Sequence, residues 1–199
     1  MSDGATDANH TDHVSELLEG QHVRLWPYFR GVYPRNTLAS LWQVMEADQA
    51  VEKVFHAQPK YGRQETPYPI RGDLISFVRY FEPDQEGTRL LLVAQAVESG
   101  EVAGMFWFDD IIIGHKANAN IWYRRKFWGH PAREASRIAC RYGFEVLGYQ
   151  AIWALTPWRT AVAHGESMGF EPVTVLPGYL LIDDHPADLT VMKLTREDL

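Results

Sequence analysis

Five basic side chains lie close together in the second half of the chain, on both sides of Gly129. They are Arg124, Arg125, Lys126, Arg133 and Arg137, and the only acid in the same stretch is Glu134. Basic side chains beside the start of a helix are typical of a site for a small anion, because the first N–H groups of a helix also attract negative charge. A solvated helix start without a ligand is the alternative, and the sequence leaves both open.

Titratable side chains gather at a second position, a predicted turn between two strands. Asp109, Asp110 and His115 lie there, and each could take a proton from a substrate. Turn capping and solvation are the alternative roles for these residues. Cys140 has no histidine partner in its segment and is interpreted as a structural thiol. The histidines lack the spacing of metal ligands, so no metal site is predicted.

The composition is typical of one globular domain. The chain has 199 residues, of which 46% are hydrophobic and 23% charged, and these proportions exclude a disordered chain. A single cysteine excludes an internal disulfide. No apolar run approaches the roughly 18 residues of a membrane span, and the first residues do not resemble a secretory signal. We therefore predict a cytoplasmic protein with no membrane partner.

The net charge of −7 is unevenly distributed along the chain. Residues 1–21 contain five acids and no lysine or arginine, which predicts a flexible acidic tail followed by a single domain at residues 22–199. The remaining 21 acids and 19 bases make the domain nearly neutral. A nearly neutral domain with one basic cluster disfavours nucleic acid as a partner.

Apolar spacing predicts the order of the helices and strands. Helices are predicted at residues 38–45, with an extension or further turn at 51–55, and at 74–81, 131–147 and 159–168. Strands are predicted at residues 22–29, 89–97, 101–113, 116–123, 151–156, 171–181 and 189–194, and a loop at 58–71. The order β-α-α-β-β-β-α-β-α-β-β indicates an α+β domain.

Short motifs in the second half carry a family resemblance. They are Glu134-Ala135, Tyr142-Gly143-Phe144-Glu145, Leu147-Gly148 and Met168-Gly169-Phe170. With the element order they resemble the GCN5-related N-acetyltransferase (GNAT) superfamily, nearest to its ribosomal-protein N-acetyltransferase branch. The segments around Trp128 and Trp158 are similar to divergent phage or prophage members. The resemblance covers residues 89–194 and implies a mixed, mostly antiparallel central sheet flanked by helices.

The resemblance implies an enzyme that transfers an acetyl group from acetyl-CoA, or from another acyl-CoA, directly to an amine of a protein N-terminus or a small molecule, without a metal. The implied CoA-binding residues are Trp122, Arg124, Arg125, Lys126, Gly129, His130, Ala132, Arg133 and Trp158. The strand position that holds a glutamate in many members is Asn118 or Asn120 here, so the catalytic base is assigned to Asp110 or His115. An open sheet edge or an exposed tryptophan surface could support a homodimer.

Two departures from the family pattern support a different hypothesis. Pro131 lies where the phosphate-binding loop has a second small residue, and it has no N–H group to donate. Trp158 and Gly165 occupy the positions of a family asparagine and of the tyrosine that protonates the leaving thiolate. The alternative function is a catalytically inactive, GNAT-like binding or assembly module of the phage-related type.

Overall fold

The computed structural model describes residues 18–28, 37–55, 58–59, 73–82, 88–182 and 184–199. Its helices are α2 (Thr37–Ala47), α3 (Val51–Phe55), α4 (Leu74–Phe81), α5 (His130–Glu145) and α6 (Arg159–Glu166), with 3-10 turns η1 (Arg125–Phe127) and η2 (Arg196–Asp198). Its strands are β1 (Val23–Pro27), β2 (Gln58–Pro59), β3 (Leu90–Ala96), β4 (Val102–Ile112), β5 (Lys116–Tyr123), β6 (Ala151–Thr156), β7 (Glu171–Ile182) and β8 (His185–Thr195).

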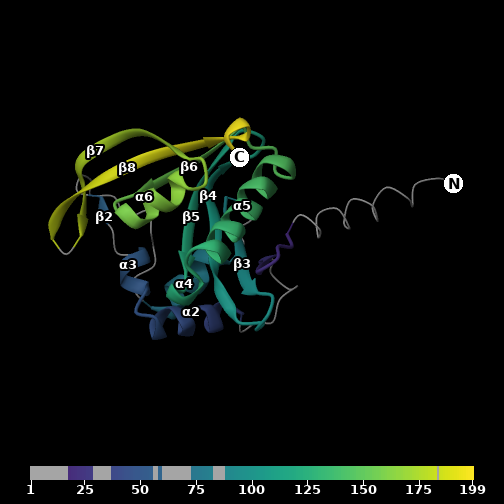
Figure 1. Ribbon diagram of the computed structural model, residues 1–199. Helices are drawn as coiled ribbons and strands as arrows, with labels where there is room; N and C mark the ends of the chain where they lie inside the picture. The colour runs from purple at the N-terminus through teal and green to yellow at the C-terminus, as the bar shows by residue number, and fades with distance from the viewer. Residues whose placement is uncertain (1–17, 29–36, 56–57, 60–72, 83–87, 183) are drawn as a thin grey trace.

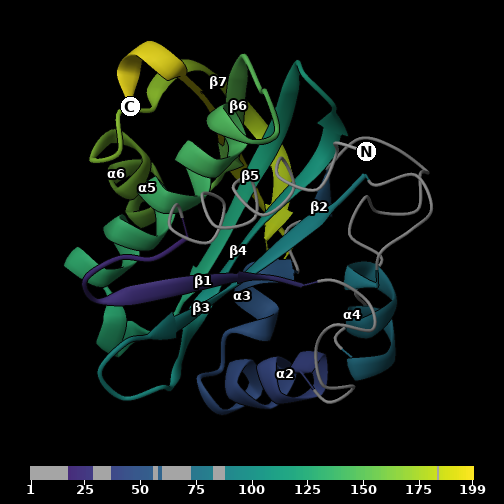
Figure 2. The ribbon, with the colours of Figure 1, turned by 90° about the vertical axis from the view of Figure 1, so that its right-hand side faces the viewer.

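The described strands form one mixed sheet in the order β1-β3-β4-β5-β6-β8-β7-β2. Its pairs are antiparallel except for β5 and β6, which are parallel and are connected through α5. A parallel pair needs such a crossover, because a tight turn cannot join strands that run in the same direction. Helices α5 and α6 cover one face of the sheet, and α2, α3 and α4 cover the other (Figures 1 and 2). The predicted fold class is confirmed.

Two apolar cores lie on opposite faces of the sheet. Phe106 and Phe108 of β4 belong to the core beneath α5, and Met105 and Trp107 belong to the core beneath α2, α3 and α4. Successive side chains of a strand point to opposite faces, so β4 supplies both cores and is buried from both sides. The same alternation puts the next residue, Asp109, on the face of Trp107.

The first helices form largely as predicted. In α2 the spaced apolar residues Leu38, Leu41, Trp42 and Met45 are buried. The segment predicted to extend this helix is a separate helix, α3, because Gln49 has a φ of 53° that interrupts helical geometry. Asp73 caps α4 by accepting a hydrogen bond from the Ser76 N–H over 2.8 Å. Among the described helices, none is both long enough and apolar enough to cross a lipid bilayer.

Some boundaries differ from the sequence prediction. β8 begins at His185 rather than at residue 189, since its first residues already pair with the end of β7. Residues 58–59 of the predicted loop form β2 against β7, and residues 60–71 lie outside the described residues.

The last residues of the predicted tail pack against the domain. Leu18 is only 6% exposed and belongs to the core beneath α5. The carboxylate of Glu134 on α5 accepts hydrogen bonds from the N–H groups of Gln21, His22 and Val23 over 2.7 to 3.2 Å. The folded domain therefore includes residues 18–21, and residues 1–17 of the predicted tail lie outside the described residues.

Candidate active site

A cleft opens where β5 and β6 part. The two strands pair only from Lys116 and Ala151 to Asn118 and Trp153. Beyond these residues β5 continues to Tyr123 without pairing to β6. The space between the two strands is part of a cleft of about 640 Å³. The carboxyl ends of parallel strands are common ligand sites in open sheets. The divergence of the one parallel pair thus creates the best candidate site.

The cleft connects the two faces of the sheet. On one face its lining includes Lys53, Val54, Tyr80, Arg89, Trp107 and Asp109. On the other face its lining includes Phe106, Ser136, Ala161, His164 and Gly165. These two sets belong to the opposite layers of helices and to the opposite faces of β4. Two reactants could therefore enter from opposite faces and meet inside the sheet.

Strand β5 presents part of its backbone to this cleft. The N–H of Arg124 bonds to the carbonyl of Ala103, next to β4. The N–H and C=O groups of successive residues point to opposite sides of a strand, so those of Ile121, three residues before Arg124, point away from β4. Ile121 lines the cleft and lies beyond the last residue that pairs with β6. Its backbone groups are available to a ligand that contains amides.

Asp109, at the end of the regular part of β4, holds a carboxylate in the cleft. Its Oδ2 accepts hydrogen bonds from the Tyr80 hydroxyl over 3.0 Å and from the Asn120 amide over 3.1 Å. Burial raises the pKa of Asp109, while the two hydrogen bonds and the charge of Arg89 act in the opposite direction. Its Oδ1 has no hydrogen-bond partner among the described residues and is left for a ligand. A partly buried carboxylate with a raised pKa suits a general base.

The two residues predicted as catalytic bases lie in different surroundings. Asp110 is at the register shift of β4, has a φ of 47° and lines the cleft. Its exposed carboxylate is paired with Lys116 over 2.8 Å. His115 lies in the exposed turn before β5 and is not part of the cleft lining. Of the titratable groups at this turn, the structure brings Asp109 and Asp110 to the cleft.

The start of α5 resembles an anion site in its backbone geometry. Gly129 precedes the helix with a φ of 90° and a ψ of −125°, and no atom lies within 4 Å of where its Cβ would be. The N–H groups of Gly129, His130 and Ala132 have no acceptor among the described residues. Pro131 lies in the first turn, where a missing N–H breaks no helical hydrogen bond. The departure at Pro131 therefore leaves three donors at this helix start.

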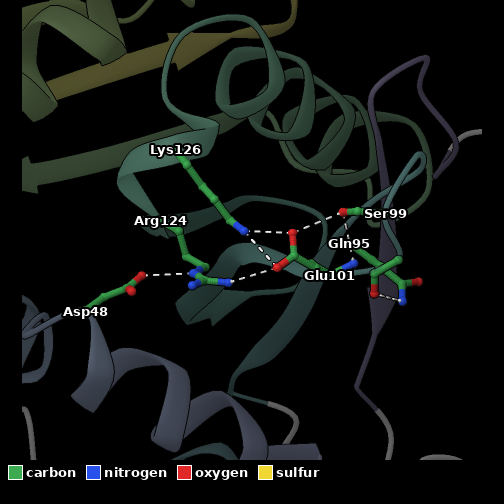
Figure 3. A network of polar contacts seen from close by, with 7 residues as sticks. Asp48, Gln95, Ser99, Glu101, Arg124 and Lys126 are labelled. Atoms are coloured by element: carbon green, nitrogen blue, oxygen red, sulfur yellow. Dashed lines mark hydrogen bonds and ion pairs between the residues drawn. The ribbon is translucent and has the colours of Figure 1, made fainter.

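Two members of the basic cluster are already paired with carboxylates. Arg124 Nε lies 3.0 Å from Asp48 Oδ2, and Lys126 Nζ lies 2.7 Å from Glu101 Oε2 (Figure 3). Arg124 also approaches Glu101 at 4.0 Å. These contacts join the end of α2, the β3–β4 turn and η1. Arg124 and Lys126 therefore stabilise the junction, and binding of an anion would compete with these pairs.

The remaining residues predicted to bind CoA fall into two groups. Arg125 and His130 are exposed and Arg133 is half-buried, and none makes an ion pair with a described residue. Trp158 precedes α6, is 39% exposed and lines the cleft. By contrast, Trp122 is buried in the core beneath α2, α3 and α4, on the face opposite α5. The structure therefore does not bring Trp122 together with the start of α5.

A chain of three polar side chains reaches the α5 and α6 side of the cleft, where two of them, Ser136 and His164, are part of the lining. The Ser136 hydroxyl lies 3.2 Å from the Tyr123 hydroxyl and 3.0 Å from His164 Nε2. Burial is the main cause that lowers the pKa of His164, and the charge of Arg133 adds to it. His164 is therefore neutral at pH 7 and can donate or accept one proton through this chain. Among the described residues, no three His, Cys, Asp or Glu side chains could hold a metal ion.

Gly165 occupies the position where the family pattern has a tyrosine, and its surroundings are too tightly packed for a large side chain. A Cβ on Gly165 would lie 3.1 Å from the sulfur and from the terminal carbon of Met192. Gly165 is buried in α6 beside His164. A large side chain could not occupy this position without moving the core.

The sequence indicates Asp109 only as one of three titratable groups and names Asn120 only as a residue in place of a glutamate, and it does not predict Tyr80 or Ser136. Strand alternation could have identified Asp109, because the residue lies two positions after the buried Trp107 on β4. Tyr80 could not be found in this way, since its partner is 29 residues away.

Solved structures that resemble this chain include several acetyltransferases. Spermidine N-acetyltransferase from Vibrio cholerae, in complex with CoA and spermine, has a TM-score of 0.68 at 16% identity, over 90% of this chain and 98% of that chain. Ribosomal-protein-S5-alanine acetyltransferase from Vibrio fischeri has a TM-score of 0.65 at 13% identity, over 90% and 96%. An acetyltransferase of the GNAT family from Bacillus anthracis has a TM-score of 0.64 at 14% identity, over 90% and 98%.

The chain has the GNAT fold. The likeness covers the first part of the chain as well as the second half that carries the sequence motifs. No family model matches the sequence, and no curated protein matches it. At these identities the solved structures establish the GNAT fold alone, and they give no support to a phage-type affinity.

Proposed function

We propose that the protein is an N-acetyltransferase that moves an acetyl group from acetyl-CoA to an amine. The observation that carries this proposal is the cleft between β5 and β6, which opens on both faces of the sheet and contains the partly buried carboxylate of Asp109. Direct transfer between two substrates needs a passage of this kind. The cytoplasmic location and the homodimer predicted from the sequence stay predictions.

The α5 side of the cleft has the groups that CoA would need. Its diphosphate would accept hydrogen bonds from the N–H groups of Gly129, His130 and Ala132, with Arg125 and Arg133 nearby. Its pantetheine amides would pair with the free backbone groups of Ile121. Trp158 would lie beside the thioester end. The V. cholerae spermidine acetyltransferase, which has the same fold, binds CoA. These features of the described residues fit acetyl-CoA as a cosubstrate.

Asp109 is our candidate for the base, in preference to Asp110 and His115. The amine loses its proton to Asp109 Oδ1, and its nitrogen forms a bond to the thioester carbon while the carbon–sulfur bond breaks. The thiolate takes up a proton from water, and Asp109 returns its own proton to solvent, so that the products are an amide and CoA. Tyr80 and Asn120 hold the carboxylate through Oδ2. Asp110 is a weaker base candidate because its carboxylate is exposed and is already paired with Lys116.

The alternative is an inactive binding or assembly module with the same fold. Gly165 favours it, since no tyrosine can protonate the thiolate from this position. His164 lies next to Gly165 in the cleft, but its lowered pKa leaves the imidazole neutral at pH 7, so the thiolate would take its proton from water. The alternative would keep the cleft but would not turn over a thioester.

Calorimetric titration with acetyl-CoA, CoA and desulfo-CoA tests the proposal first. We expect micromolar affinity for all three ligands, followed by release of free thiol when an amine acceptor is added. Binding without thiol release across a broad amine panel would favour the inactive module. No binding at millimolar ligand would overturn the proposal.

A further inference from the structure

The face of the cleft beneath α2, α3 and α4, opposite the proposed CoA side, would receive the amine acceptor. It contains basic as well as acidic groups. We propose that the acceptor is an amine that also carries an anionic group, a carboxylate or a phosphate, with its amine at Asp109 and its anion at Lys53 and the indole N–H of Trp107. This inference rests on the proposed acetyltransferase function and specifies its substrate class.

The amine end of this site is Asp109. Both donors that reach the carboxylate, Tyr80 and Asn120, bond to Oδ2. Oδ1 has no partner among the described residues, and Asp109 lines the cleft. One carboxylate oxygen is thus held in position while the other is available to an N–H group of the acceptor.

The anion end lies at the last turn of α3. Lys53 lines the cleft, its side chain is exposed, and it makes no ion pair or hydrogen bond with a described residue. A lysine in the wall of a cleft without a carboxylate partner is suited to bind an anionic group of a ligand.

Trp107 supplies a second, independent observation. The residue is 2% exposed and lines the same cleft, and its indole N–H is buried without a hydrogen-bond partner among the described residues. Its ring lies 5.9 Å from that of Phe55, centroid to centroid, next to the α3 turn that carries Lys53. Buried N–H donors are almost always paired, so an acceptor oxygen on a ligand would complete this site.

The charge balance of the cleft argues against a polyamine. Asp109 and Asp110 are the carboxylates among its described lining residues, and Lys53 and Arg89 are also part of the lining. Lys116 already pairs with Asp110 over 2.8 Å. A polycation would meet one available carboxylate and repulsion from the basic side chains. The V. cholerae relative, which was solved with spermine, would thus differ from this chain in its acceptor.

Thiol release measured with matched amines tests the inference. The panel pairs ethanolamine phosphate with ethanolamine, and β-alanine and 4-aminobutyrate with their amides, and adds putrescine and spermidine. We expect kcat/KM for at least one anion-bearing amine to exceed that of its uncharged counterpart by about tenfold or more, and that of both polyamines. The phosphate and carboxylate arms identify which anion is preferred. Equal rates within every pair, a preference for polyamines, or no turnover of any anion-bearing amine by protein that binds acetyl-CoA would overturn the inference.

Variants link the preference to the two donors. Lys53→Met should raise KM for the preferred anionic amine about tenfold without changing that of its uncharged counterpart, and Lys53→Glu should move the preference toward putrescine. Trp107→Phe keeps an aromatic ring but removes the N–H, and should weaken the same selectivity. Lys193→Met, on β8 outside the cleft lining, is the matched control with unchanged selectivity. An unchanged anion preference in Lys53→Met would overturn the role of Lys53.

Calorimetry with acetyl-CoA distinguishes the two possible failures. If the protein does not bind acetyl-CoA, the proposed function fails and this inference fails with it. If it binds acetyl-CoA and acetylates amines without preferring an anionic group, only this inference fails.

Discussion

The Tyr80 hydroxyl donates a hydrogen bond to Asp109 Oδ2 over 3.0 Å and thereby joins α4 to the end of β4. Arg89 completes the arrangement, because its guanidinium lies 4.4 Å from the centre of the Tyr80 ring and donates to the Tyr80 carbonyl. The carboxylate is thus partly buried, held through one oxygen and close to positive charge. These are the conditions under which a carboxylate can be both ionised and basic.

Asp109→Asn should abolish most of the activity. The amide keeps the shape and the contacts to Tyr80 and Asn120 but cannot accept a proton, so kcat/KM should fall by roughly 100- to 10,000-fold, the usual range for loss of a general base. The affinity for acetyl-CoA, measured by calorimetry, should not change. Asp110→Asn is the matched control, with a much smaller effect. The reverse order of the two effects would make Asp110 the base.

The pH dependence of kcat/KM should report the pKa of Asp109. Burial raises this pKa above its ordinary value of 3.8, and the base works only when it is deprotonated, so activity should fall as the pH drops through the raised pKa. Tyr80→Phe removes a hydrogen bond that lowers this pKa, and should move the acidic limb to higher pH. An unmoved limb in Tyr80→Phe would exclude Asp109 as the group that titrates.

Asp109→Asn should raise the stability of the folded protein at neutral pH, because burial disfavours the charged carboxylate. Because the pKa of Asp109 is raised in the folded state, the stability that it contributes is full below pH 3.8 and is lost as the pH rises through the raised pKa. At pH 7 the variant should therefore be more stable than the native protein in urea unfolding, and the difference should shrink toward pH 3. A variant that is less stable at pH 7 would contradict this reasoning.

Gly129→Val should prevent binding of acetyl-CoA while the fold persists. The φ of 90° strains any other residue, at about 1–3 kcal/mol, and the side chain would occupy open space at the start of α5, where the proposed diphosphate would bind. Gly114→Val is a good control, since Gly114 also has a positive φ, of 71°, and an empty Cβ position, but lies in the turn between β4 and β5. Both variants should lose similar stability, and only Gly129→Val should lose CoA affinity. Equal affinity in the two variants would remove the anion site from the start of α5.

Restoring a tyrosine at position 165 should destabilise the protein rather than improve catalysis. The new side chain would have to displace Met192, and overpacking of this kind costs about 1–3 kcal/mol. Gly165→Ala should be tolerated, because only the flexible end of Met192 must shift. Urea unfolding of the two variants measures the difference. A stable and more active Gly165→Tyr protein would show that the α6 side of the cleft is wider than described.

The sequence by itself determined the elements whose signals are local. The apolar spacing of α2, the position of α4 and the bounds of β5 and β6 all follow from neighbouring residues, and the structure confirms them. The GNAT fold also followed from the sequence, since the order of elements and the short motifs of α5 and α6 are read along the chain. Gly129 at the start of α5 is also predicted from local sequence, because the glycine directly precedes the residues whose spacing indicates the helix.

Only the tertiary structure decided which members of each cluster are available for chemistry. Asp109 and Asp110 are neighbours of the same type, but Tyr80 and Asn120 hold one inside the cleft, while Lys116 pairs with the other at the surface. Arg124 is paired with Asp48, a residue 76 positions away, and is therefore not a free cation of the basic cluster. The partner of a side chain depends on segments that folding brings together from far along the chain, and composition and spacing carry no record of that pairing.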